Sequence, residues 1–228
     1  MSDFKFTRPE SFPPIVKNLI IINVLVFIAQ AIFEGLTRKI MMYPVQHPEF
    51  KPYQIATHMF AHAPLPAIFH IVFNMFGLWM FGKILENVWG AKRFLFFYLA
   101  CGVGAAFLHL AIQYFTWEQM EAAYNAGNMA KAQSYGASLG PALGASGAVM
   151  GIFAAFAYLF PNTELFIMFI PFPIKAKWAM LGLAAIDLFG GVANVSGDNI
   201  AHFAHLGGAI TGFILVLIWN KTGRKRFY

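Results

Sequence analysis

Six apolar runs, each close to twenty residues long, limit most strongly what this chain can fold into. They cover residues 15–33, 67–85, 94–115, 143–160, 178–195 and 200–219. An α-helix needs about 20 residues to cross the hydrocarbon core of a bilayer. Because 59% of the residues are hydrophobic and only 11% are charged, the composition excludes an ordinary soluble domain. The chain is predicted to be an all-α polytopic membrane protein, a bundle of six transmembrane helices.

One membrane domain accounts for almost the whole chain. We expect a cytoplasmic N-terminal segment at residues 1–14, the six-helix domain at residues 15–220 and a basic cytoplasmic tail at residues 221–228. The polar start lacks the apolar core and small-residue cleavage site of a removable signal peptide. The single cysteine, Cys101, permits no intramolecular disulfide.

The basic residues predict the orientation, because Lys and Arg are enriched on the cytoplasmic side of membrane proteins. With six spans and the N-terminus inside, twelve of the 16 Lys and Arg residues fall inside. Only Arg38, Lys39, Lys51 and Lys131 fall outside. Both termini are therefore predicted to be cytoplasmic. The formal charge of +6 follows from this topology, so we expect lipid rather than nucleic acid as a partner.

Three connecting segments differ in character. Residues 36–66 are punctuated by prolines yet rich in apolar side chains, which indicates a partly helical loop resting in the outer leaflet. Residues 116–140 are polar and predict an exposed, partly helical loop. Residues 163–177 form an apolar run that Pro171 and Pro173 interrupt. That run predicts an extended connector embedded in the interface.

Two short motifs carry the chemistry. Gly144-Ala145-Ser146-Gly147 stands at the head of the fourth apolar run, and Ala204-His205 is followed by Gly207 and Gly208 in the sixth. A lone serine among small residues is typical of close helix packing. A serine and an imidazole together, however, make a nucleophile and its base.

The predicted topology places these groups at one depth, because the second, fourth and sixth spans all run inward from the outer face. Counted from those ends at about 1.5 Å per residue, Ser146, His205, His70 and Asn74 lie about 5 to 10 Å below the outer surface. His70 and Asn74 are four apart and share one helix face. They predict donors for an oxyanion, together with the Ser146 amide; interhelical hydrogen bonding is the alternative.

Taken in order, the motifs resemble those of the rhomboid family of intramembrane serine proteases. They are His70-x-x-x-Asn74, Gly144-Ala145-Ser146-Gly147 and Ala204-His205-x-x-Gly208-x-x-x-Gly212. The resemblance covers about residues 15–220. It implies a six-helix core that cleaves transmembrane segments of membrane-protein substrates near the outer face of the bilayer, without a cofactor.

The resemblance also implies a role for each matching residue. Ser146 would be the nucleophile and His205 the general base and later acid, with no third acid. His70, Asn74 and the Ser146 amide would hold the oxyanion. The loop at 36–66 would correspond to the family's first loop, and the fifth span to its lateral gate.

Two positions depart from the family pattern. Tyr53-Gln54 stands where a Trp-Arg pair is common, which places an arginine-centred loop network in question. Met150 stands where an aromatic residue often packs against the catalytic imidazole. A thioether can also pack against a ring.

Other chemistries compete with the protease interpretation. His58 and His62 are four apart and His202 and His205 are three apart, a spacing that suits zinc. Because no His-Glu-x-x-His run exists and carboxylates are scarce, we expect no metal. His58 and His62 are instead expected to hold the loop together, and His202 to form a hydrogen bond near the outer interface.

Asp187 is an intramembrane acid and so a functional suspect, but the sequence assigns it no part in catalysis. A rhomboid relative that binds membrane clients without cleaving them is a second alternative, and a small transporter is a third. The short tail and the lack of a transit-like segment favour a bacterial inner membrane.

Overall fold

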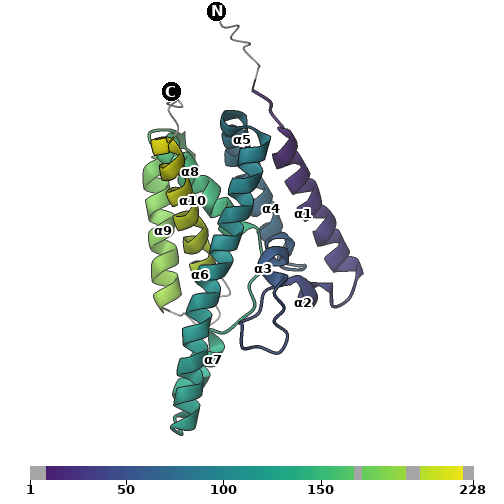
Figure 1. Cartoon of the computed structure of the whole chain (residues 1–228), viewed down its shortest axis with the longest axis vertical. Helices are drawn as coiled ribbons and strands as arrows, with labels where there is room; N and C mark the ends of the chain where they lie inside the picture. Colours follow the sequence, from purple (N-terminus) through teal and green to yellow (C-terminus); the bar gives the residue numbers. More distant parts are fainter. Residues whose placement is uncertain (1–8, 167–170, 194–200, 223–228) are drawn as a thin grey trace, which may run out of the picture.

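The computed structural model describes residues 9–166, 171–193 and 201–222, and most of these residues are helical (Figure 1). In chain order the helices are α1 (Pro14–Ile32), α2 (Leu36–Ile40), α3 (Gln54–Thr57), η1 (His58–Phe60), α4 (Phe69–Gly77), η2 (Leu78–Gly82), α5 (Lys83–Trp89), α6 (Ala91–Asn125), α7 (Met129–Ala137), α8 (Ser146–Leu159), α9 (Ala176–Ala193) and α10 (His202–Thr222). The predicted helical class is confirmed.

Each of the six apolar runs contains helix. In the second run, α4 and α5 are joined by the π-helical turn η2, so the chain is helical from Phe69 to Trp89. Three helices, α1, α6 and α10, are long and apolar enough to cross a membrane, whereas α8 is apolar but has only 14 residues. The count of six spans stays a prediction.

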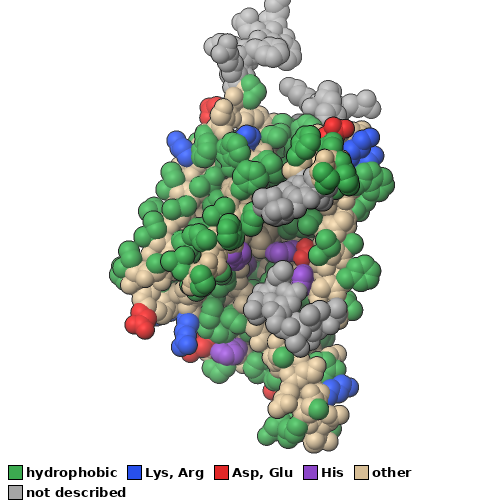
Figure 2. Space-filling view, turned by 180° about the vertical axis from the view of Figure 1, so that it is seen from behind, with side chains coloured by type: hydrophobic (Ala, Val, Ile, Leu, Met, Phe, Trp, Pro, Cys, Tyr) green, Lys and Arg blue, Asp and Glu red, His purple; other side chains and the backbone are tan. Residues whose placement is uncertain are grey.

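Hydrophobic side chains cover much of the lateral surface (Figure 2). They come from several helices and include Ile32 on α1, Phe107 on α6 and Phe189 on α9, which are 68%, 60% and 72% exposed. So much exposed apolar surface would be unfavourable in water and is compatible with lipid. The start of α1 and the end of α10 lie at the same end of the bundle (Figure 1).

Helix α6 is longer than the sequence predicted. The third span was expected to end near residue 115, yet the helix continues to Asn125 and is followed by α7, so the two helices form a hairpin that projects beyond the core (Figure 1). Residues 116–125 contain neither glycine nor proline, and Trp117 Nε1 donates to Glu121 Oε1 one turn later at 2.9 Å. Helix α6 therefore continues through residues 116–125, although these residues are less hydrophobic than those before them. It ends shortly before Gly127, which adopts a φ of +74°. The expected exposed, partly helical character of this segment is confirmed.

Helices α8 and α10 pack with their backbones in direct contact. A Cβ atom added to Gly208 would collide with the Gly147 backbone, and one added to Gly212 would collide with the Gly151 backbone. The absence of side chains at Gly208 and Gly212 therefore allows these two helices to approach closely. Gly207 instead faces α6, since an added Cβ would lie 2.8 Å from Gly104 O.

The start of α1 is fixed by a carboxylate from another helix. Glu86 on α5 is buried, with 3% of its surface exposed. Its two oxygens accept the amides of Ile15 and Val16 at 2.9 and 2.8 Å. These amides have no partner within their own helix, so Glu86 joins α1 to α5.

The connecting segments largely agree with expectation. The loop at 36–66 carries α2, α3 and η1, so its partly helical character is confirmed. Within 163–177, strands β1 (Glu164–Leu165) and β2 (Ile174–Lys175) pair antiparallel, while residues 167–170 lie outside the described residues.

Candidate active site

Ser146 is the first residue of α8, where backbone amides lack helical partners. It therefore lies in the first turn of its helix, at the head of the fourth apolar run, as the sequence predicted. The preceding residues cannot be helical because Gly144 has a φ of +128°. Gly144 N donates to His58 O at 2.9 Å, which attaches this turn to the loop at 36–66.

His205 is the fourth residue of α10 and reaches Ser146 across the contact between α8 and α10. Its Nε2 lies 2.8 Å from Ser146 Oγ. This distance is within the range for an O–H donor and an imidazole acceptor. The structure thus brings together the two residues, 59 positions apart, that the sequence paired as nucleophile and base.

His70, on α4, lies beside the turn that precedes Ser146. Ala63 N donates to its Nδ1 at 3.1 Å, so in the neutral ring the proton is on Nε2. A Cβ atom added to Gly144 would lie 2.9 Å from this Nε2. An N–H donor therefore faces the turn between Gly144 and Ser146, which suits the predicted oxyanion role.

Asn74 lies one turn further along α4 and is buried, with 6% of its surface exposed. Its Nδ2 donates to His70 O at 2.7 Å, which leaves the second amide N–H for another acceptor. The structure places Asn74 next to His70 as predicted, and its oxyanion role stays a prediction.

Asp187, to which the sequence assigned no part in catalysis, lies against the predicted base. It lies on α9, is 5% exposed, and its Oδ1 is 3.0 Å from His205 Nδ1 and 2.9 Å from His202 Nδ1. The resemblance implied no third acid, yet the packing of α9 on α10 brings a carboxylate within hydrogen-bond distance of His205. The one signal in the sequence was an acid inside an apolar span. The predicted hydrogen bond of His202 is confirmed, and its partner is Asp187.

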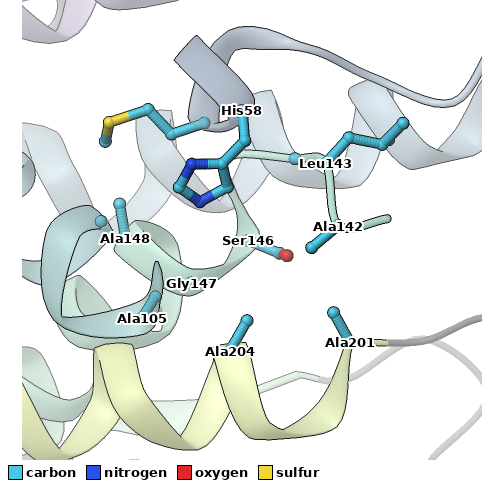
Figure 3. A pocket seen from close by; sticks show the side chains of 12 residues that line it. His58, Ala105, Ala142, Leu143, Ser146, Gly147, Ala148, Ala201 and Ala204 are labelled. Atoms are coloured by element: carbon cyan, nitrogen blue, oxygen red, sulfur yellow. The ribbon is translucent and has the colours of Figure 1, made fainter. Parts of the chain in front are cut away.

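A small cavity of about 10 Å³ adjoins the serine (Figure 3). Its walls are mainly alanine and glycine, and the imidazole of His58 and the hydroxyl of Ser146 also line it. The size corresponds to about one water molecule. On the space-filled surface, histidine side chains gather in a recess beside an acidic side chain (Figure 2).

Two buried histidines hold the loop at 36–66, as predicted. His58 Nδ1 is 3.0 Å from Gln54 O, and His62 Nδ1 is 3.3 Å from Phe60 O, while the backbone N–H of His62 donates to Gln30 Oε1 on α1 at 3.0 Å. Burial lowers the pKa of His58. Burial, together with the nearby His70, lowers the pKa of His62 to about 4.

Gln54 takes the central place in this loop. Its side chain is almost fully buried; Oε1 accepts the Lys51 amide at 3.1 Å, and Nε2 donates to Glu49 O at 3.0 Å and Lys39 O at 3.3 Å. A glutamine network thus stands where the family pattern suggested an arginine.

Among the described residues, no group of three His, Cys, Asp or Glu side chains is arranged to hold a metal ion. His202 and His205, whose spacing suggested zinc, both direct Nδ1 to Asp187 instead.

Comparison with known proteins adds a family match. The Rhomboid domain model matches residues 49–221. The human presenilin-associated rhomboid-like protein, mitochondrial, is 32% identical over 216 residues, covering 90% of this chain and 50% of the relative. Yeast (Saccharomyces cerevisiae) rhomboid protein 1, mitochondrial, is 30% identical, covering 69% and 40%. Arabidopsis thaliana RHOMBOID-like protein 12, mitochondrial, is 30% identical, covering 93% and 60%.

The chain spans about half the length of the curated mammalian relatives it matches. All three relatives described above are named mitochondrial. The expectation of a bacterial inner membrane is contradicted by these names. That expectation rested on the short tail and the lack of a transit-like segment, and the chain covers only part of the length of these relatives.

Proposed function

Because the chain belongs to the rhomboid family, we propose that it is an intramembrane serine endopeptidase that cleaves transmembrane segments of other membrane proteins near the outer face of the bilayer. The observation that supports this proposal most directly is the 2.8 Å contact between His205 Nε2 and Ser146 Oγ. A client-binding relative without protease activity would have no need of this pair.

The proposed first step is attack on a substrate carbonyl. Ser146 Oγ forms a bond to the carbonyl carbon while its proton passes to His205 Nε2. The carbonyl electron pair moves to oxygen, and the oxyanion is held by the Ser146 amide, His70 and Asn74. His205 then protonates the amine as the C–N bond breaks. Water, with His205 again as base, hydrolyses the acyl-enzyme.

We further propose that the six apolar runs form six spans, with both termini on the inner side, where the basic residues are concentrated, and the site open to the outer face. The substrate helix must unwind locally before its carbonyl is accessible, so cleavage is expected near small or helix-destabilising residues. Lipid surrounds the bundle, and α9 occupies the place of the lateral gate. The mitochondrial names of the relatives favour a mitochondrial membrane, which subcellular fractionation of the native cells tests.

Cleavage of a single-span substrate by purified protein in detergent tests the proposal. Wild type, Ser146→Ala, His205→Ala and a chelator-treated sample are compared. We expect cleavage by the wild type with or without chelator and none by either variant. Full activity of Ser146→Ala would refute the serine chemistry, and loss of activity with chelator would point to a metal. Substrate binding by the wild type without cleavage would favour the client-binding alternative.

A further inference from the structure

Asp187 is a buried carboxylate that the dyad chemistry proposed above does not use. It projects from α9, and both of its observed partners, His202 and His205, come from α10. An isolated buried charge is strongly unfavourable, and paired hydrogen bonds reduce the cost. Here a single oxygen, Oδ1, receives two imidazole nitrogens at 2.9 and 3.0 Å.

The contact determines which nitrogen of His205 carries the proton. An ionised carboxylate only accepts hydrogen bonds, so the atom beside Oδ1, His205 Nδ1, must be the N–H donor. In the neutral ring Nε2 then has no hydrogen. Nε2 is the atom 2.8 Å from Ser146 Oγ, so the ring is held in the tautomer that can take the serine proton.

The geometry points to Asp187 as a positioning residue for His205, an inference that rests on the proposed serine chemistry. When the Ser146 proton reaches Nε2, the ring becomes an imidazolium, and the carboxylate at Nδ1 stabilises its positive charge while keeping its own proton count unchanged. The proton later leaves from Nε2 to the departing amine. Asp187 acts through His205 and does not touch the substrate.

His202 and Gly190 hold the carboxylate at its working position. His202 is 7% exposed and donates from Nδ1 to the same oxygen, so its contact keeps Asp187 against α10. A Cβ atom added to Gly190 on α9 would lie 2.5 Å from the His202 ring. The absence of a side chain at 190 therefore sets the close spacing of α9 and α10 on which the Asp187 contact depends.

The competing interpretation is a structural clamp, since polar side chains often join membrane helices by hydrogen bonds. The two interpretations predict different effects when Asp187 is replaced. Removing a clamp lowers the stability of the fold and the amount of active protein. Removing a positioning acid lowers the rate of the chemical step in protein that is still folded and still binds substrate.

The test measures kcat, KM and thermal stability of full-length wild type, Asp187→Asn, Asp187→Glu and His202→Asn with one single-span substrate in detergent. Asparagine conserves the shape and removes the charge. We expect Asp187→Asn to lower kcat at least about tenfold with KM changed less than about threefold, and Asp187→Glu to restore part of the rate. His202→Asn removes one support of Asp187 but neither member of the Asp187–His205 pair, and we expect it to lower kcat less than Asp187→Asn does.

Ser146 can also be labelled by a fluorophosphonate, in which Oγ displaces fluoride from phosphorus. The rate of this labelling reports how well His205 activates Ser146, and it needs no peptide substrate. Slower labelling of folded Asp187→Asn supports the inference even if the wild type cuts no substrate, an outcome that would refute only the protease proposal. Equal labelling and equal kcat in Asp187→Asn would overturn the inference, as would reduced stability with an unchanged rate per folded molecule. A wild type that neither cleaves nor labels would overturn both.

Discussion

Gly144 allows the side chains of Ser146 and His70 to lie close together. Its φ of +128° is a conformation that residues with a side chain rarely adopt. An added Cβ would also lie 2.9 Å from the His70 ring. The absence of a side chain at Gly144 therefore allows both the backbone turn and the close approach of His70, the proposed oxyanion donor, which the sequence motif alone does not reveal.

Gly144→Ala is predicted to lower kcat at least about tenfold, because the methyl group displaces the His70 ring from the oxyanion site. Backbone strain should also cost about 1–3 kcal/mol of stability. The matched control is Gly140→Ala, where an added Cβ meets nothing within 4 Å. Cleavage rate and thermal stability are measured for both. Wild-type kcat in Gly144→Ala would show that His70 is not constrained by this turn.

His62 makes the stability of the loop at 36–66 depend on pH. Its pKa is about 4 in the folded protein against 6.5 in an unfolded chain. Between these two pH values the unfolded state therefore binds more protons than the folded state. The contribution of neutral, buried His62 to the free energy of unfolding is complete above pH 6.5 and is lost as the pH falls towards 4. The full contribution is about 3 kcal/mol, from 1.36 kcal/mol for each pKa unit.

Thermal unfolding in detergent from pH 7 to pH 4 checks this effect. The melting temperature of the wild type is expected to fall with pH, and that of His62→Gln to fall less steeply, because glutamine does not titrate in this range. The slope is compared rather than the absolute value, since the substitution also changes packing. Identical slopes in the two proteins would assign the acid sensitivity to other groups, such as His58.

At the scale of whole elements, helix ends are held by residues distant in sequence. Glu86 accepts two amides at the start of α1 across about 70 positions. Its partners could not be predicted, because the pairing depends on how α1 packs against α5.

Glu86→Ala is predicted to destabilise the protein by about 1–3 kcal/mol, because the part-buried Ile15 amide and the buried Val16 amide lose their acceptors. Glu118→Ala removes an acid from the exposed part of α6 and is the control, expected to change stability by less than about 0.5 kcal/mol. Thermal unfolding of both variants measures the difference. Equal stability of Glu86→Ala and wild type would mean that water replaces the carboxylate at this end of α1.

At the scale of the whole molecule, hydropathy and the counted depth of residues within each span were enough to predict much of the helix arrangement. The order of apolar runs predicted which helices run in the same direction, and so that Ser146, His205 and His70 would meet. The contact with Asp187 could not be predicted in this way, because it depends on the rotation and spacing of α9 against α10. The extension of α6 was missed because falling hydropathy was taken as the end of a helix, although residues 116–125 contain no breaker.

The proposed topology makes one further prediction about the whole molecule. With six spans and both termini on the inner side, the hairpin of α6 and α7 is outside, while the connector with β1 and β2 is inside. Glu118 and Glu164 are both exposed and lie on these two segments. The only native cysteine, Cys101, is fully buried, so it should not interfere with labelling of introduced cysteines.

In sealed vesicles with the outer face exposed, a membrane-impermeant maleimide should label Glu118→Cys and should label Glu164→Cys only after the membrane is permeabilised. The wild type should remain unlabelled throughout. Labelling of both variants before permeabilisation would place the two segments on the same side. The chain between them would then cross the membrane an even number of times, and α8 could not be the one span that separates them. Ser146, at the first residue of α8, would lose the position near the outer face from which the proposed cleavage site was deduced.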